Sequence, residues 1–341
     1  ASWGRALSRR RIERIASFPL SASPIFLKTL LGEMRVANVE AKLDPMLEKY
    51  LGVTDIPGLF DLILERLEAD FSRTLVATAL SLIWGGRSGL TENEILEIGN
   101  VFPLQWATLR NSLAEGLRDQ GGRVAFSHDF LRAAVEFRYL ACDDAKTKNH
   151  LAIADYFESR PPDERQVEEL PYQLRAAREL KRLRNLLEDL DRFSLLRSRG
   201  DGELLGYWLP LKAEGVEPEE RLCDLFFERA GPSHQWHDPE LLGVASEICE
   251  FFHFAGLHGE AAVRLETSRA LVAQRIFGDD DPLALSDMLR LASIRFASGD
   301  WGGALTLQDT VLQVRARTLG ENHPDTLSCM NARAITLRAL G

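Results

Sequence analysis

The last hundred residues of this 341-residue chain contain a pattern that returns about every 42 positions. Arg275-Ile276-Phe277-Gly278 returns as Arg317-Thr318-Leu319-Gly320, and Asp281-Pro282 returns as His323-Pro324. Proline in the first turn of a helix costs no hydrogen bond, and the residue before it is placed to cap that helix. Each unit therefore reads as a helical hairpin, which buries its apolar faces only by stacking on its neighbours.

Helical periodicity also dominates the rest of the chain. Residues 56–71 place Leu59, Ile63 and Leu67 on one stripe at spacings of three to four residues. Clean alternating strands are nearly absent, and the one plausible hairpin has Gly121-Gly122 at its turn. The sequence thus predicts an all-α protein that carries a small β element.

Residues 71–140 have a readable order of elements. The expected helices span 71–84, a short stretch opened by Thr91, 103–117 and 129–140. Thr91 and Glu94 have the spacing of a capping box, in which each side chain satisfies a backbone N–H of the other. The Gly-Gly hairpin falls between the third and fourth helices. Three helices followed by a hairpin wing predict a winged-helix domain.

The charge of the chain argues against nucleic acid as a partner. The net charge is −10 and the isoelectric point is near 5.3. Neutralising phosphates requires clustered Lys and Arg. The third helix and its end carry only Arg110 and Arg118 as basic residues, against Glu115 and Asp119. A winged helix in this chain is therefore expected to be structural.

The cysteines and the apolar runs indicate the cellular compartment in which the protein is expected. The four cysteines stand far apart and form no C-x-x-C pair, which argues against a zinc ribbon or a dithiol redox site. So few cysteines in so long a chain are typical of a reducing cytoplasm. The longest apolar run, around Leu75 to Trp84, is too short to cross a bilayer, and no signal-peptide pattern follows the basic start. We expect a cytoplasmic protein that does not engage a membrane.

Metal and catalytic motifs do not stand out. His234 and His237 have the spacing of metal ligands, but the prolines around them predict a loop and no third ligand is evident. No Ser/His/Asp or Cys/His set rises above chance. The phosphate-binding pattern G-x-x-x-x-G-K-[ST] does not occur. We expect no metal site, no catalytic residue and no ATP hydrolysis by these residues.

The repeat resembles the tetratricopeptide repeat of the kinesin light chain type. The stretch from Leu319 to Leu327 (LGENHPDTL) is similar to the signature between repeats in that family, and the resemblance covers about residues 245–341. In that family an asparagine of the first helix touches bound peptide. Asn331 stands at the matching place, and the preceding repeat has Leu289 there. The resemblance implies a protein or peptide ligand on the repeats.

The earlier part resembles the region that follows the nucleotide-binding core in STAND-class NTPases of the NACHT type, especially nephrocystin-3-like proteins. Residues 22–27 (ASPIFL) are similar to G-N-P-L-F-L, whose proline packs near the nucleotide base, which implies that role for Pro24. Residues 126–129 (FSHD) resemble the M-H-D motif, whose histidine contacts the β-phosphate of ADP, which implies that role for His128. Residues 150–157, 169–172 and 204–208 are similar to the linker helices of these proteins.

The two resemblances together imply an order of four parts. These are a helical lid remnant of a nucleotide-binding module (1–54), a winged-helix domain (55–141), a helical linker of degenerate repeats (142–244) and truncated tetratricopeptide repeats (245–341). ADP or ATP would be held by the protein's own N-terminal nucleotide-binding domain, and no cofactor is expected in the present residues. The implied function is the regulatory and sensor part of a signalling ATPase that oligomerises on activation, with defence signalling as the family context.

Two other functions are compatible with the same residues. The first is a tetratricopeptide scaffold that gathers protein partners without a switch. The second is a regulator that places its winged helix on DNA, which the local charge opposes.

Overall fold

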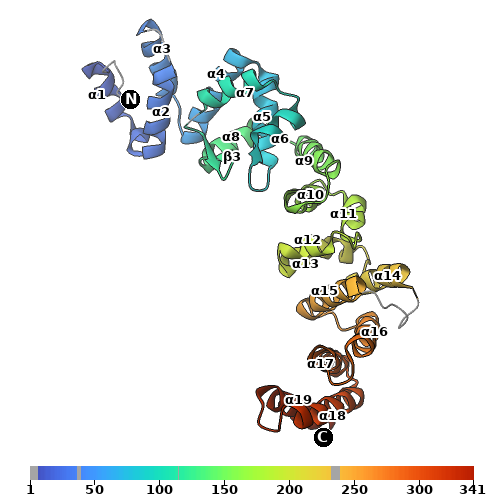
Figure 1. The fold of residues 1–341 in the computed structure, drawn as a ribbon. Coiled ribbons are helices and arrows are strands. Elements are labelled where there is room, and N and C mark those ends of the chain that lie inside the picture. The colour runs from blue at the N-terminus through green and yellow to red at the C-terminus, as the bar shows by residue number, and fades with distance from the viewer. Residues whose placement is uncertain (1–6, 37–39, 114, 232–238) are drawn as a thin grey trace. The chain divides into compact units, whose positions relative to one another are not determined.

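The computed structural model describes residues 7–36, 40–113, 115–231 and 239–341. The described chain falls into two compact units, and Figure 1 labels their helices and strands. The first unit comprises residues 1–161 and 172–178, and the second comprises residues 162–171 and 179–341. The described residues are mostly helical, as the periodicity predicted.

The first unit contains nine α-helices, one short 3-10 helix and three strands within its described residues. They are α1 (Arg9–Ser17), η1 (Pro19–Ala22), α2 (Pro24–Val36), α3 (Glu40–Tyr50), α4 (Ile56–Phe71), α5 (Arg73–Gly85), β1 (Leu90–Thr91), α6 (Glu92–Gly99), α7 (Pro103–Ser112), β2 (Leu117–Gln120), β3 (Arg123–Phe126), α8 (Asp129–Tyr139) and α9 (Asp143–Glu158). The capping box at the start of α6 is present as predicted.

The strands form an antiparallel sheet in the order β1-β3-β2. The predicted hairpin is confirmed, because β2 and β3 pair with Leu117 opposite Phe126, and both glycines of the turn have positive φ. The short strand β1 was not predicted from the sequence. It pairs Leu90 with Val124, and at the preceding Gly89 an added Cβ would lie 2.7 Å from the carbonyl oxygen of Val124.

The prediction for the third helix was wrong at its C-terminal end. Helix α7 ends at Ser112, not at Leu117. Leu117 belongs to β2, and the amide of Ser127 donates to the carbonyl oxygen of Gly116 at 2.9 Å. The hydrogen-bonded pairing between β2 and β3 thus begins one residue before β2, at Gly116. These hydrogen bonds take the place of the helical hydrogen bonds that a longer α7 would have made.

The second unit is helical throughout its described residues. Helix α10 (Glu164–Ala176) contributes to both units. The following helices are α11 (Leu180–Leu187), α12 (Phe193–Ser198), α13 (Asp201–Ala213), α14 (Pro218–Ala230), α15 (Pro239–Ala255), α16 (Glu260–Phe277), α17 (Pro282–Ala297), α18 (Trp301–Thr318) and α19 (Pro324–Leu340).

The repeat predicted the boundaries of the last helices correctly. Asp281 caps α17 by accepting from the amide of Leu283 at 2.8 Å, and His323 occupies the same place before α19. Gly278 and Gly320, which end the preceding helices, have φ values of 95° and 92°. Successive helices from α15 to α19 pack against one another, as stacked hairpins require.

The interface between α16 and α17 contains an ionic triad that was not predicted from the sequence. The guanidinium of Arg269 pairs with Glu266 on its own helix and lies 2.6 Å from Asp287 on α17. Their side chains are 2%, 0% and 11% exposed, respectively. One repeat later, the equivalent places hold Gln308, Val311 and Cys329, all buried. Val311 and Cys329 belong to an apolar cluster with Leu285 and Met288.

Candidate functional site

His128 occupies the N-cap of α8, directly after the sheet. Its Nδ1 accepts a hydrogen bond from the amide of Leu131 at 3.4 Å, while its backbone is extended. A neutral imidazole that accepts at Nδ1 carries its proton on Nε2. The local structure therefore presents Nε2–H as the donor of this side chain.

The surroundings of His128 favour its neutral form. The ring packs against Phe60 of α4 with 4.7 Å between centroids. Partial burial lowers the pKa of His128 below its ordinary value, against the opposing effects of its backbone hydrogen bond and of Asp129, and the charge of Lys28 makes the smallest contribution to the lowering. At neutral pH the side chain is thus an uncharged hydrogen-bond donor.

Helix α2 brings Lys28 toward this region. The ammonium of Lys28 lies 2.7 Å from the carboxylate of Glu115, in the connection between α7 and β2. Pro24 is the first residue of α2 and is exposed. Pro24 and Lys28 are four residues apart, so they share a face of the helix.

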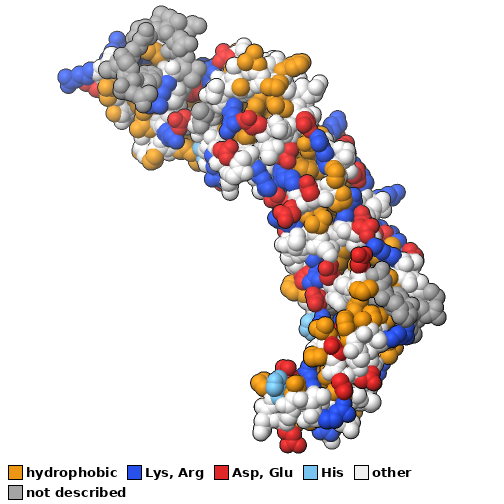
Figure 2. All heavy atoms as spheres, viewed as in Figure 1, with side chains coloured by type: hydrophobic (Ala, Val, Ile, Leu, Met, Phe, Trp, Pro, Cys, Tyr) orange, Lys and Arg blue, Asp and Glu red, His pale blue; other side chains and the backbone are white. Residues whose placement is uncertain are grey.

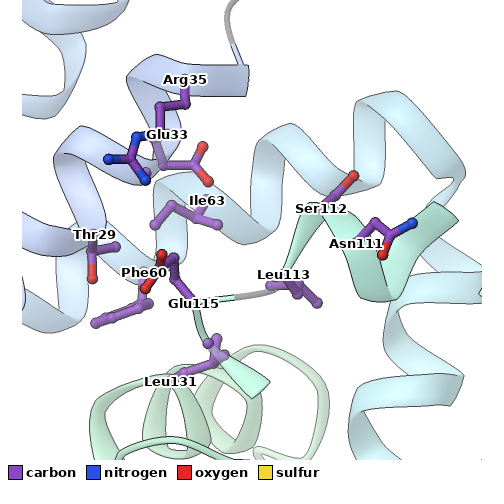
Figure 3. Close-up of a pocket in the computed structure, with 12 residues that line it drawn as sticks. Thr29, Glu33, Arg35, Phe60, Ile63, Asn111, Ser112, Leu113, Glu115 and Leu131 are labelled. Carbon is purple, nitrogen blue, oxygen red and sulfur yellow. The ribbon is translucent and has the colours of Figure 1, made fainter. Parts of the chain in front are cut away.

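A cavity of about 250 Å³ lies beside this region, between α2, α4, the end of α7 and α8 (Figure 3). Its apolar lining includes Phe60, Ile63 and Leu131, and Glu33 and Glu115 supply carboxylates. Figure 3 shows Glu33 and Arg35 extending from α2 and Ser112 from the end of α7. Neither Pro24 nor His128 is among the lining residues, although Phe60 joins the lining to the His128 ring.

Glu33 is fixed on the wall of this cavity. Arg66 of α4 binds both of its oxygens, at 2.6 and 2.9 Å, and the hydroxyl of Tyr50 donates to it at 2.9 Å. Burial and the Glu33 carboxylate together raise the pKa of Tyr50. A bidentate pair with a third donor is a stable arrangement for a buried carboxylate. These contacts join α2, α3 and α4, and sequence reasoning missed them because their members are 16 to 33 residues apart.

Of the two basic residues at the predicted third helix and its end, Arg110 is engaged by acidic side chains and Arg118 is exposed. Arg110 is paired with Glu92 and lies 3.7 Å from Asp119. On the face drawn in Figure 2, Lys and Arg side chains are interspersed with Asp and Glu. This distribution lacks the one-signed patch that phosphate binding requires.

Asn331 lies on α19 and is exposed. Its equivalent Leu289 is partly buried and packs against the cluster of Leu285, Met288, Val311 and Cys329. The two repeats therefore offer different side chains at the position that the resemblance assigns to peptide contact.

His234 and His237 lie outside the described residues. Within the described ranges no group of three His, Cys, Asp or Glu side chains could hold a metal ion. The same ranges contain no helix that is long and apolar enough to span a membrane.

Comparison with known proteins identifies the type of repeat at the C-terminal end of the described chain. A family model described as tetratricopeptide repeat matches residues 284–341, which comprise α17 to α19 and confirm that the chain carries such repeats. No solved structure matches the chain.

Curated relatives are also tetratricopeptide repeat proteins by name. A TPR repeat-containing protein of Dictyostelium discoideum is 28% identical over 225 residues, covering 64% of this chain and 14% of the relative. A putative tetratricopeptide repeat protein 41 of Homo sapiens is 24% identical over 248 residues, covering 58% of this chain and 19% of the relative. The chain therefore spans only a small part of the length of the curated relatives that it matches.

Proposed function

We propose that this chain is a protein-interaction module whose repeats hold a protein or peptide ligand, with Asn331 on the binding face. The observation that carries the proposal is the tetratricopeptide match over α17 to α19, on which Asn331 is exposed. An exposed carboxamide offers two donors and an acceptor, which suits the backbone of an extended peptide. The chain itself is proposed to have no catalytic role.

A peptide selection tests this proposal. Peptides are selected from a random library on the intact chain, and their affinities are measured for Asn331→Ala and for Gln313→Ala. Gln313 is an exposed carboxamide on α18 and serves as the matched control. We expect Asn331→Ala alone to weaken the selected peptides, by about tenfold for a lost pair of hydrogen bonds. Equal affinities for the two variants would contradict the assignment of Asn331.

A second candidate function is a nucleotide-dependent latch, and the geometry of His128 favours it. The elements from α5 to β3 follow the order helix, strand, helix, helix, strand, strand, which is the order expected of a winged helix. His128 follows this module with a neutral ring whose Nε2–H can donate to a phosphate oxygen. In this proposal, ADP held by an N-terminal nucleotide-binding domain of a longer protein keeps it closed. A ligand on the repeats then favours the open, oligomerising state.

Two substitutions at one position separate the latch from simple helix capping. His128→Ala removes both the cap and the imidazole, whereas His128→Ser keeps a good N-cap and removes only the imidazole. If the latch operates, both variants of the longer protein oligomerise without ligand, as measured by light scattering after gel filtration. A His128→Ser protein that behaves like the unchanged protein would leave the histidine with a capping role only, and the scaffold function would stand alone.

A further inference from the structure

A groove of about 480 Å³ crosses the surface formed by α5, α6, α8 and α9, away from the cavity beside α2. Its apolar lining includes Leu82, Ile98 and Leu140. Its polar lining includes Thr78 and Ser81 of α5. The groove is therefore amphipathic, with an aliphatic base and hydroxyl groups along one helix.

The charges of the groove are all of one sign. Its ionisable cations are Arg73, Arg138 and Lys148, and no Asp or Glu is among the residues that line it. This is unusual in a chain that has ten more acidic than basic residues. A local cationic lining in an acidic protein creates a site that attracts anions.

Two of these cations are available to a ligand. Arg138 is held by Glu68 and Asp61, with distances of 2.7 to 2.8 Å. Arg73 and Lys148 are exposed and make no described hydrogen bond or ion pair with the part of the chain that the structure covers. Arg73 influences the carboxylate of Glu68 electrostatically, and that carboxylate is already engaged by Arg138 and by the hydroxyl of Tyr139 at 2.7 Å.

We propose that this groove binds an acidic peptide segment of a partner protein, with leucine-like side chains on its base and carboxylates on Arg73 and Lys148. The aliphatic base favours a peptide over a nucleic acid, because no aromatic side chain other than Tyr139 lines the groove to stack on bases. The site lies in the first unit and is distinct from the Asn331 face. Its outcome is therefore independent of the peptide-binding proposal for the repeats.

Fluorescence anisotropy on the full chain tests the groove with a labelled peptide in which two leucines are flanked by glutamates. The test variant is Arg73→Glu combined with Lys148→Glu. The control variant is Arg118→Glu combined with Lys181→Glu, two exposed cations elsewhere that give the same change in net charge. We expect the test variant to weaken binding by at least about tenfold and the control by less than about twofold.

Hydrogen exchange and competition complete the test. Bound peptide is expected to slow exchange in α5 and α9, and raised salt is expected to weaken binding. The proposal is overturned if both charge-reversal variants lose affinity equally, because that result indicates non-specific attraction. It is also overturned if a single-stranded oligonucleotide competes as well as unlabelled peptide, or if the peptide does not bind the unchanged chain.

Discussion

The interfaces α16–α17 and α18–α19 occupy equivalent places in the repeat and differ in chemistry at three equivalent buried positions. The first contains Glu266, Arg269 and Asp287, and the second contains neutral side chains at the same positions. Helix boundaries, caps and glycine turns are nevertheless alike in the two repeats. The period of the repeat thus specifies the backbone, while the chemistry of each interface is free to vary.

The two interfaces should differ most when one side chain is removed. A buried ion pair gains little over an apolar contact, because desolvation offsets much of its attraction. Removing one partner, however, leaves a charge that is buried without compensation. Truncating an apolar side chain such as Val311 in the α18–α19 interface loses only contact area and leaves a cavity. Equivalent substitutions are therefore expected to have unequal costs.

The largest effect is predicted for Arg269→Val. It leaves the carboxylates of Glu266 and Asp287 buried together, although Arg290 lies 4.0 Å from Asp287 and offsets part of the cost. We expect the free energy of unfolding to fall by about 3–5 kcal/mol, measured by urea denaturation of the full chain. Hydrogen exchange should show the loss in α16 and α17 first, since each repeat contacts only its neighbours. A loss below about 1 kcal/mol would contradict the argument that removing Arg269 leaves uncompensated buried charge.

The second prediction concerns a triple variant in which the three triad residues are replaced by their equivalents from the α18–α19 interface. Glu266→Gln, Arg269→Val and Asp287→Cys together reproduce the side chains of the α18–α19 interface. Exchanging a buried ionic set for neutral residues of similar size is often neutral, or stabilising by about 1–4 kcal/mol. We therefore expect the triple variant to recover most of the loss caused by Arg269→Val, with the remainder due to the volume of the arginine that valine leaves unfilled. A triple variant as unstable as Arg269→Val would show that the ionic triad stabilises its interface.

The third prediction concerns Val311, an apolar position of the α18–α19 interface. Val311→Ala removes two methyl groups from the cluster that contains Cys329. At about 0.8 kcal/mol for each buried carbon, with a further cavity term, the expected loss is about 2 kcal/mol. The same urea experiment measures it. An effect equal to that of Arg269→Val would remove the distinction between the interfaces.

The sequence could predict the shared features of these repeats and not their difference. Asp281 and His323 are recognisable as caps because a proline follows each of them at a 42-residue interval. Glu266 and Arg269 have the spacing of an ordinary surface pair, and nothing local places them against Asp287. Comparing these positions with Gln308 and Val311 would have been the available signal.

Around His128, too, the sequence could predict the local features and not the contacts between distant elements. Its capping role follows from a helix start after a hairpin, which the sequence contains. Its contact with Phe60 and the influence of Lys28 depend on helices 68 and 100 residues away. The short pairing of Leu90 with Val124 is likewise non-local. Such contacts have no period, so periodicity cannot reveal them.

The smallest effect on the free energy of unfolding is predicted for Asp287→Asn. Its pH dependence tests whether burial or Arg269 has the greater effect on the pKa of Asp287. Burial raises the pKa of Asp287 above its ordinary value of 3.8, against the opposing influence of Arg269. The folded state then binds this proton more tightly than the unfolded state, so the contribution of Asp287 to stability rises as the pH falls through its raised pKa.

Asparagine keeps an oxygen that accepts from Arg269 and leaves Glu266 to balance the guanidinium. We therefore expect Asp287→Asn to change the free energy of unfolding by no more than about 1 kcal/mol at pH 7. Between pH 7 and pH 4, the unchanged chain should gain stability relative to the variant in parallel urea titrations. The reverse trend would mean that Arg269 dominates the titration of Asp287, and the triad would then stabilise the α16–α17 interface most at neutral pH.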